Sequence, residues 1–70
     1  MAKIEDGELN KTQVKIMNYL RAELADKAKF VSYTAIGKKV SESRNTVKYN
    51  VNRLVKLGLL HIQDGELSLA

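Results

Sequence analysis

The sequence lacks several residue types, and their absence excludes whole classes of chemistry. It contains no Cys and a single His, so disulfides, thiolate catalysis and a zinc site built from Cys and His are excluded. No apolar run approaches the roughly 20 residues that a membrane-spanning helix needs. The first ten residues also lack the apolar centre of a signal peptide. We therefore expect a single small domain in the cytoplasm, because a chain of 70 residues rarely holds more than one hydrophobic core.

Acidic residues are scarce in the middle of the chain. Residues 11–57 hold eleven Lys and Arg against three acidic residues, a net charge of +8. Residues 1–10 and residues 58–70 each carry a net charge of −2. The total of +4 therefore hides a basic centre between two acidic ends. This distribution favours a localised anionic partner over a uniformly adhesive surface.

Residues 43–60 predict a helix with a defined start, two different faces and a defined end. Ser43 is a favourable N-cap, and Gly58 tolerates the left-handed backbone that ends many helices. The inward face is apolar and comprises Val47, Val51, Leu54 and Val55. The outward face carries amides, a phenol and cations but no acid, and it comprises Arg44, Asn45, Lys48, Tyr49, Asn52, Arg53 and Lys56. This inventory suits base edges and phosphates, and an ordinary solvated helix face is the alternative.

The N-terminal third predicts an arm followed by a helix. We expect residues 1–8 to form a flexible arm and residues 9–70 to form a single domain. Asn10 and Gln13 have the spacing of a capping box, which starts a helix that we expect to end at about residues 25–28. Its core face would comprise Val14, Met17, Leu20 and Leu24, with Ile16 at the margin. Tyr19 and Ala22 lie outside this stripe, as surface residues or as the contact of a possible homodimer.

The segment before residue 43 predicts a short strand, a second helix and a tight turn. Residues 29–33 predict the strand, with Phe30 in the core, and a strand this short needs a partner. Residues 34–40 predict the helix, capped by Ser32 or Thr34. A Gly in the middle of this helix, Gly37, is expected where another helix approaches closely. Ser41 and Glu42 would form the turn, with Glu42 exposed.

After Gly58 the period of the apolar residues changes to two. Asp64-Gly65 lies between two alternating runs, which is the strongest short signal for a β-hairpin. A two-residue turn there would pair Gln63 with Glu66, Ile62 with Leu67 and Leu60 with Leu69. The strand at residues 29–33 could add to this hairpin. The resulting order α-β-α-α-β-β predicts an α+β, mainly α, winged helix-turn-helix fold with a small antiparallel sheet.

Residues 43–60 also carry a family resemblance. They read S-R-N-T-V-K-Y-N-V-N-R-L-V-K-L-G-L-L and resemble the recognition helix of winged-helix bacterial regulators, most of all the N-terminal DNA-binding domains of the gluconate-repressor (GntR) family. That family reads S-R-x-T-V, then an apolar residue four positions on, and closes with Gly-Leu-Leu or Gly-Leu-Ile. The likeness extends into residues 62–65, which are similar to that family's wing, and it covers roughly residues 30–69.

The resemblance implies roles for the matching positions. Arg44 would contact a guanine edge or a phosphate, and Asn45 and Lys48 would contact bases or the backbone nearby. Ser43 would reach a phosphate with its hydroxyl. Gly65 would let the tip of the wing approach the minor groove.

Together these patterns predict a sequence-specific binder of double-stranded DNA, a small prokaryotic or viral transcriptional regulator. It would be either a stand-alone regulator or the DNA-binding piece of something longer. The helix of residues 43–56 would lie in the major groove. Lysines before it would hold phosphates, namely Lys38 and Lys39 and also Lys11 or Lys15.

Other functions remain as alternatives. One is a winged-helix protein-interaction module in a larger complex, and another is a shape-reading binder of left-handed DNA or double-stranded RNA. An enzyme is not expected, because Ser43 has no His in a suitable context and the scattered Gly residues form no phosphate-binding loop. We expect no cofactor and no metal.

Overall fold

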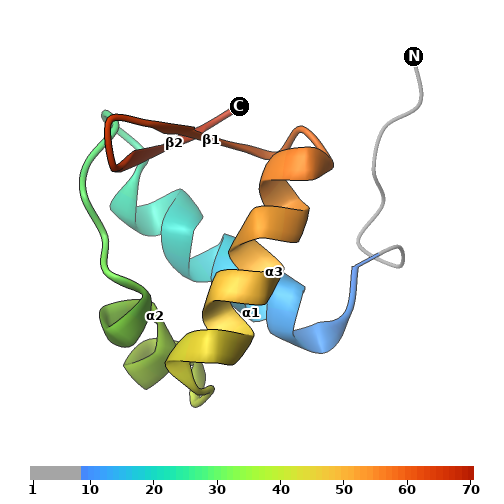
Figure 1. Ribbon diagram of the computed structural model, residues 1–70. Helices are drawn as coiled ribbons and strands as arrows, with labels where there is room; N and C mark the ends of the chain where they lie inside the picture. The colour runs from blue at the N-terminus through green and yellow to red at the C-terminus, as the bar shows by residue number, and fades with distance from the viewer. Residues whose placement is uncertain (1–8) are drawn as a thin grey trace.

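The protein has an α+β fold that is mainly α. The structure, a computed structural model, describes residues 9–70, so the expected arm at residues 1–8 lies outside the described residues. The elements follow in the order α1 (Lys11–Glu23), α2 (Tyr33–Val40), α3 (Arg44–Lys56), β1 (Leu60–Gln63) and β2 (Glu66–Leu69). The three helices pack together, and the hairpin of β1 and β2 lies at the C-terminal end of α3 (Figure 1). None of these helices is long and apolar enough to span a membrane.

The start of α1 is the capping box that the sequence predicts. The Asn10 side chain accepts a hydrogen bond from the Gln13 backbone N–H at 2.8 Å, and the Gln13 side chain accepts one from the Asn10 N–H at 3.1 Å. The helix ends at Glu23, before the predicted end at residues 25–28. Leu24 is the last buried residue, and residues 25–28 are all exposed. A further turn would bury no apolar surface, so packing gives no reason to extend the helix.

The core face of α1 is rotated slightly from the predicted stripe. Ile16, which was expected at the margin, is fully buried, whereas Val14 is only half-buried. The buried line runs through Gln13, Ile16, Met17 and Leu20. The apolar stripe did not predict this rotation because Gln13 is polar, and only its role in the capping box was expected. Of the two residues outside the stripe, Tyr19 is half-buried against the core and Ala22 is exposed.

The turn between α2 and α3 depends on Gly37. Ser32 caps α2 by accepting from the Ala35 N–H at 3.0 Å, and Ser41 ends it in the left-handed region at φ 60°. A Cβ atom on Gly37 would lie 2.5 Å from the Glu42 carbonyl oxygen and 3.6 Å from Val47 Cγ2. The expected close approach is therefore present, and its tightest neighbour is the backbone of the turn.

Helix α3 begins and ends as its sequence predicts. The Ser43 hydroxyl accepts from the Thr46 N–H at 3.2 Å. At the other end Gly58 has φ 82°, and the Leu59 N–H donates to the Leu54 carbonyl at 3.0 Å. This pattern is the Schellman motif, which satisfies carbonyls that the helix leaves free. Along its inner side Val47, Val51 and Leu54 are fully buried.

The hairpin has the predicted register, but the predicted third strand is wrong. Leu60 pairs with Leu69, His61 with Ser68, Ile62 with Leu67 and Gln63 with Glu66. Positive φ values at Asp64 and Gly65, 54° and 81°, match the two-residue turn that Asp-Gly favours.

Of residues 29–33, only Lys29 pairs with the hairpin, through two backbone hydrogen bonds to Leu67 at 3.0 and 2.9 Å. The sheet therefore has two strands, and the order is α-α-α-β-β. The chain has to leave the sheet after Lys29 because Ser32 already caps α2. Phe30, which was expected in the core, is 70% exposed as a result.

The close contact at Gly37 can be tested by the sign of the change in the free energy of unfolding when Ala replaces Gly. Ala in place of Gly normally stabilises a helix by about 1 kcal/mol. We expect Gly37→Ala instead to lower the free energy of unfolding by about 1–3 kcal/mol, because the added methyl group meets the Glu42 carbonyl. Urea denaturation measures this, with Thr34→Ala on the exposed side of α2 as the control. A Gly37→Ala protein more stable than the wild type would show that the turn yields without cost.

Candidate nucleic-acid interface

The outward face of α3 is open to solvent along its whole length. All seven predicted side chains are exposed, namely Arg44, Asn45, Lys48, Tyr49, Asn52, Arg53 and Lys56. Tyr49 is 64% exposed, which is high for an aromatic side chain. Ser43, at the N-cap, is exposed as well. The predicted division of this helix into a buried and an open face is therefore confirmed.

The packing of α3 explains why this face is free. Its buried residues, Val47, Asn50, Val51 and Leu54, lie on one side of the helix. In Figure 1, α3 lies in front of α1 and beside α2, with its other side turned to solvent. The helix lacks acidic residues throughout, so this open side carries only neutral polar and positively charged groups.

The cations on this face have no internal counterion within residues 9–70. In that range the ion pairs join Lys15 to Glu42 at 3.6 Å and Lys29 to Glu23 at 3.5 Å. The four basic residues of α3 take part in neither pair. Among the described residues nothing but solvent ions faces these positive charges, and a polyanion can displace such ions.

Lys38 and Lys39 extend the positive charge onto α2. Both are exposed in its last turn, and neither forms an ion pair with another described residue. Their place at the end of α2 also has a structural benefit, because cations are favoured near a helix C-terminus. The turn at residues 41–43 separates them from the start of α3, so both groups border the same turn.

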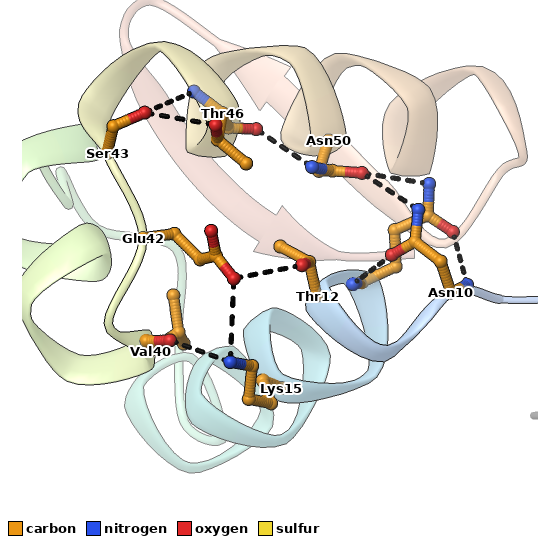
Figure 2. Close-up of polar contacts among 9 residues, drawn as sticks. Asn10, Thr12, Lys15, Val40, Glu42, Ser43, Thr46 and Asn50 are labelled. Carbon is orange, nitrogen blue, oxygen red and sulfur yellow. Dashed lines mark hydrogen bonds and ion pairs between the residues drawn. The ribbon is translucent and has the colours of Figure 1, made fainter.

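Lys15 does not fit the predicted role in phosphate binding. Its Nζ donates to the Val40 carbonyl at 2.9 Å and pairs with Glu42, so it is engaged within the fold (Figure 2). Glu42 itself was expected to be exposed, but its side chain is only 29% accessible and also accepts from Thr12 Oγ1 at 3.2 Å. Lys11, by contrast, is exposed and unpaired in the described part of the chain.

Two hollows on the surface are lined in part by residues that were predicted to bind DNA. Tyr49, Asn52, Arg53 and Lys56 line a shallow one of about 210 Å³ on α3. A second, of about 300 Å³, lies between residues 30–34, the hairpin and the start of α3, and it brings Arg44 and Gly65 together. Its walls include Phe30 and Ile62, which are 70% and 41% exposed. The acidic residues Asp64 and Glu66 flank Gly65 at the hairpin tip, so this end of the site is less favourable to phosphate than α3.

One polar residue of α3, Asn50, lies on the buried side of the helix, opposite the open face. Asn50 is 4% exposed, and its side-chain oxygen accepts from Asn10 Nδ2 and Gln13 Nε2. Its side-chain nitrogen donates to the Thr46 carbonyl at 2.9 Å. A signal was available, because position 50 is three residues after Val47 and four before Leu54, on the apolar stripe. An amide at such a position indicates a buried hydrogen-bonding site.

Residues that could bind a metal ion are dispersed over the described part of the chain. Across residues 9–70 no group of three or more His, Asp and Glu side chains is placed to hold a metal ion. His61 is exposed on β1, as are its neighbours Ile62 and Gln63. A comparison of the chain with family models, curated proteins and solved structures found no match.

Proposed function

We propose that this protein is a winged helix-turn-helix domain that binds double-stranded DNA in a sequence-specific manner, as a small transcriptional regulator in the cytoplasm. The observation that carries the proposal is the open face of α3, with four cations, two amides and a phenol and no acid. Arg and Lys suit phosphates and guanine, and Asn suits adenine. A solvated helix with no binding role has no need to exclude acidic residues along 13 positions.

The arrangement of α2 and α3 supports docking in the major groove. They are joined by a three-residue turn, residues 41–43, which is typical of a helix-turn-helix pair. In such pairs the N-terminal residues of the second helix contact base edges and the first helix crosses the backbone. We assign base contacts to Arg44, Asn45 and Lys48, and phosphate contacts to Lys38 and Lys39. Tyr49, Asn52, Arg53 and Lys56 follow along the groove.

The hairpin has a bracing role in this proposal. Leu60 and Leu67 are buried, so β1 and β2 cover one end of the core. The carboxylates of Asp64 and Glu66 would repel phosphates at the tip, whereas Gly65 permits a close approach of the backbone to DNA. One domain of this size covers a short site, so we also propose that two copies bind neighbouring half-sites.

Salt dependence tests DNA binding directly. Fluorescence anisotropy of a labelled random duplex would be titrated with the protein at about 50 mM and 200 mM salt. With about five phosphate contacts, we expect the affinity to fall by about 100-fold or more across this range. Absence of binding at the lower salt concentration would refute the proposal. Salt-sensitive binding would be followed by selection of a preferred duplex.

Single substitutions then separate base contacts from phosphate contacts. We expect Arg44→Ala to weaken binding to the selected duplex by about 1–3 kcal/mol more than binding to random duplex, because a guanine contact is lost. Lys38→Ala should weaken binding to both duplexes alike and reduce the salt slope by about 1. Arg21→Ala, which removes an exposed arginine on α1, is the matched control. Equal losses on both duplexes for Arg44→Ala would remove its base-reading role.

The hollow that contains Arg44 and Gly65 favours a second candidate function, a protein-interaction module. Phe30 and Ile62 expose apolar surface there, and the nearby charges of Asp64 and Glu66 disfavour DNA. Clustered exposed apolar side chains are typical of surfaces that bind other proteins. Under the DNA proposal, Phe30→Ser should leave DNA affinity within about twofold of the wild type. An absence of DNA binding at low salt, with the fold intact, would favour this second candidate.

A further inference from the structure

The orientation of α3 is defined by polar contacts in addition to apolar packing. Among the described residues, the buried polar side chains are Gln13 and Asn50, and they are bonded to each other. Gln13 Nε2 donates to Asn50 Oδ1 at 3.1 Å, and Asn10 Nδ2 donates to the same oxygen at 3.3 Å. The amide nitrogen of Asn50 donates to the Thr46 carbonyl, so both ends of the amide are used.

These bonds form a connected path from one helix cap to another. Asn10 caps α1, and Ser43 caps α3 by accepting from the Thr46 N–H. Asn50 links them, since it bonds Asn10 on one side and the Thr46 carbonyl on the other (Figure 2). No buried side-chain nitrogen or oxygen within residues 9–70 lacks a partner. The buried amides of Gln13 and Asn50 therefore both have partners, and satisfied buried polar groups can fix a structure.

A second set of contacts joins the start of α1 to the turn before α3. Glu42 accepts from Thr12 Oγ1 at 3.2 Å and pairs with Lys15, whose Nζ also reaches the Val40 carbonyl. In Figure 2, the Glu42 contacts and the Asn50 contacts lie at separate places along the start of α1. Two separated anchors resist rotation and sliding of α3 better than one.

We infer that Asn50 is a positioning residue that fixes the rotation of α3 against α1 and thereby sets which side chains can read a base pair. Apolar packing is non-directional, whereas a hydrogen bond constrains both distance and angle. A rotation of α3 by about 20° would move an outward-facing atom by about 2 Å, because side chains reach roughly 5–6 Å from a helix axis. Hydrogen bonds tolerate a spread of only about 0.5 Å. The inference rests on the proposed DNA-binding function.

The test compares specificity with affinity. Asn50→Leu keeps the branched shape of the side chain and removes its three hydrogen bonds. We expect the ratio of affinities for the selected and the random duplex to fall at least tenfold, the loss of about one base contact. The salt slope should stay unchanged, because no phosphate contact is removed. A wild-type ratio in folded Asn50→Leu protein would overturn the inference.

Gln13→Met provides a second variant that acts from a distance. Gln13 is 7% exposed on α1, so it cannot touch DNA, and Met keeps its length while removing both the donor to Asn50 and the acceptor of the Asn10 N–H. We expect a smaller fall in the same ratio, about threefold or more, and an unchanged ratio would count against the inference. Asn18→Leu on the exposed side of α1 controls for the substitution, and Ile16→Val controls for a loss of stability alone.

A measurement without DNA separates this inference from the proposed function. Residual dipolar couplings of the backbone N–H groups of α1 and α3 report how the two helices are oriented relative to each other, and their periodic variation along each helix reports its rotation about its own axis. We expect the α3 couplings of Asn50→Leu to change relative to those of α1, while those of Asn18→Leu match the wild type. Unchanged couplings would overturn the positioning role even if DNA binds. Changed couplings in a protein that binds no DNA would retain the orienting role and refute only the proposed function.

Discussion

The close contact between Gly37 and the Glu42 carbonyl is the constraint on which the rest of the structure depends. A side chain on residue 37 would meet this oxygen at 2.5 Å, so α2 and α3 approach as they do only because Gly is present. Ser41 completes the turn in the left-handed region. This approach lets Ile36 on α2 and Val47 on α3 enter the same core, where both are fully buried. The small residue thus determines how α3 leaves the turn, and with it the direction in which its open face points.

The distribution of charge follows from this packing. Where α1 meets the turn, Lys15 and Glu42 face each other and their charges are used inside the fold. On α3 the inner side is filled by apolar side chains and Asn50, so every cation of the helix is directed outward. The proposed function needs this separation, because cations paired with nearby carboxylates would attract a phosphate backbone much less strongly. The same separation leaves the acidic hairpin tip as a different kind of surface, with Phe30 and Ile62 beside it.

Much of the fold could be predicted because the decisive signals are local. The capping box at Asn10, the cap at Ser43, the end at Gly58 and the hairpin turn at Asp64-Gly65 each depend on a few neighbouring residues, and each is present. The open face of α3 was predictable for the same reason, since helical periodicity alone divides the apolar from the polar positions. Whether this face contacts DNA stays a prediction.

The sequence by itself determined the caps, the turns, the hairpin register and the two faces of α3, because these follow from local backbone chemistry and periodicity. Only the tertiary structure decided the roles of residues whose partners lie far along the chain. Phe30 is exposed because the cap of α2 takes the backbone out of the sheet. Asn50 is buried because its side chain bonds to Asn10 and Gln13, which lie 40 and 37 residues away in the sequence. A pattern within one element cannot contain such information, since the partner that satisfies a buried group belongs to another element.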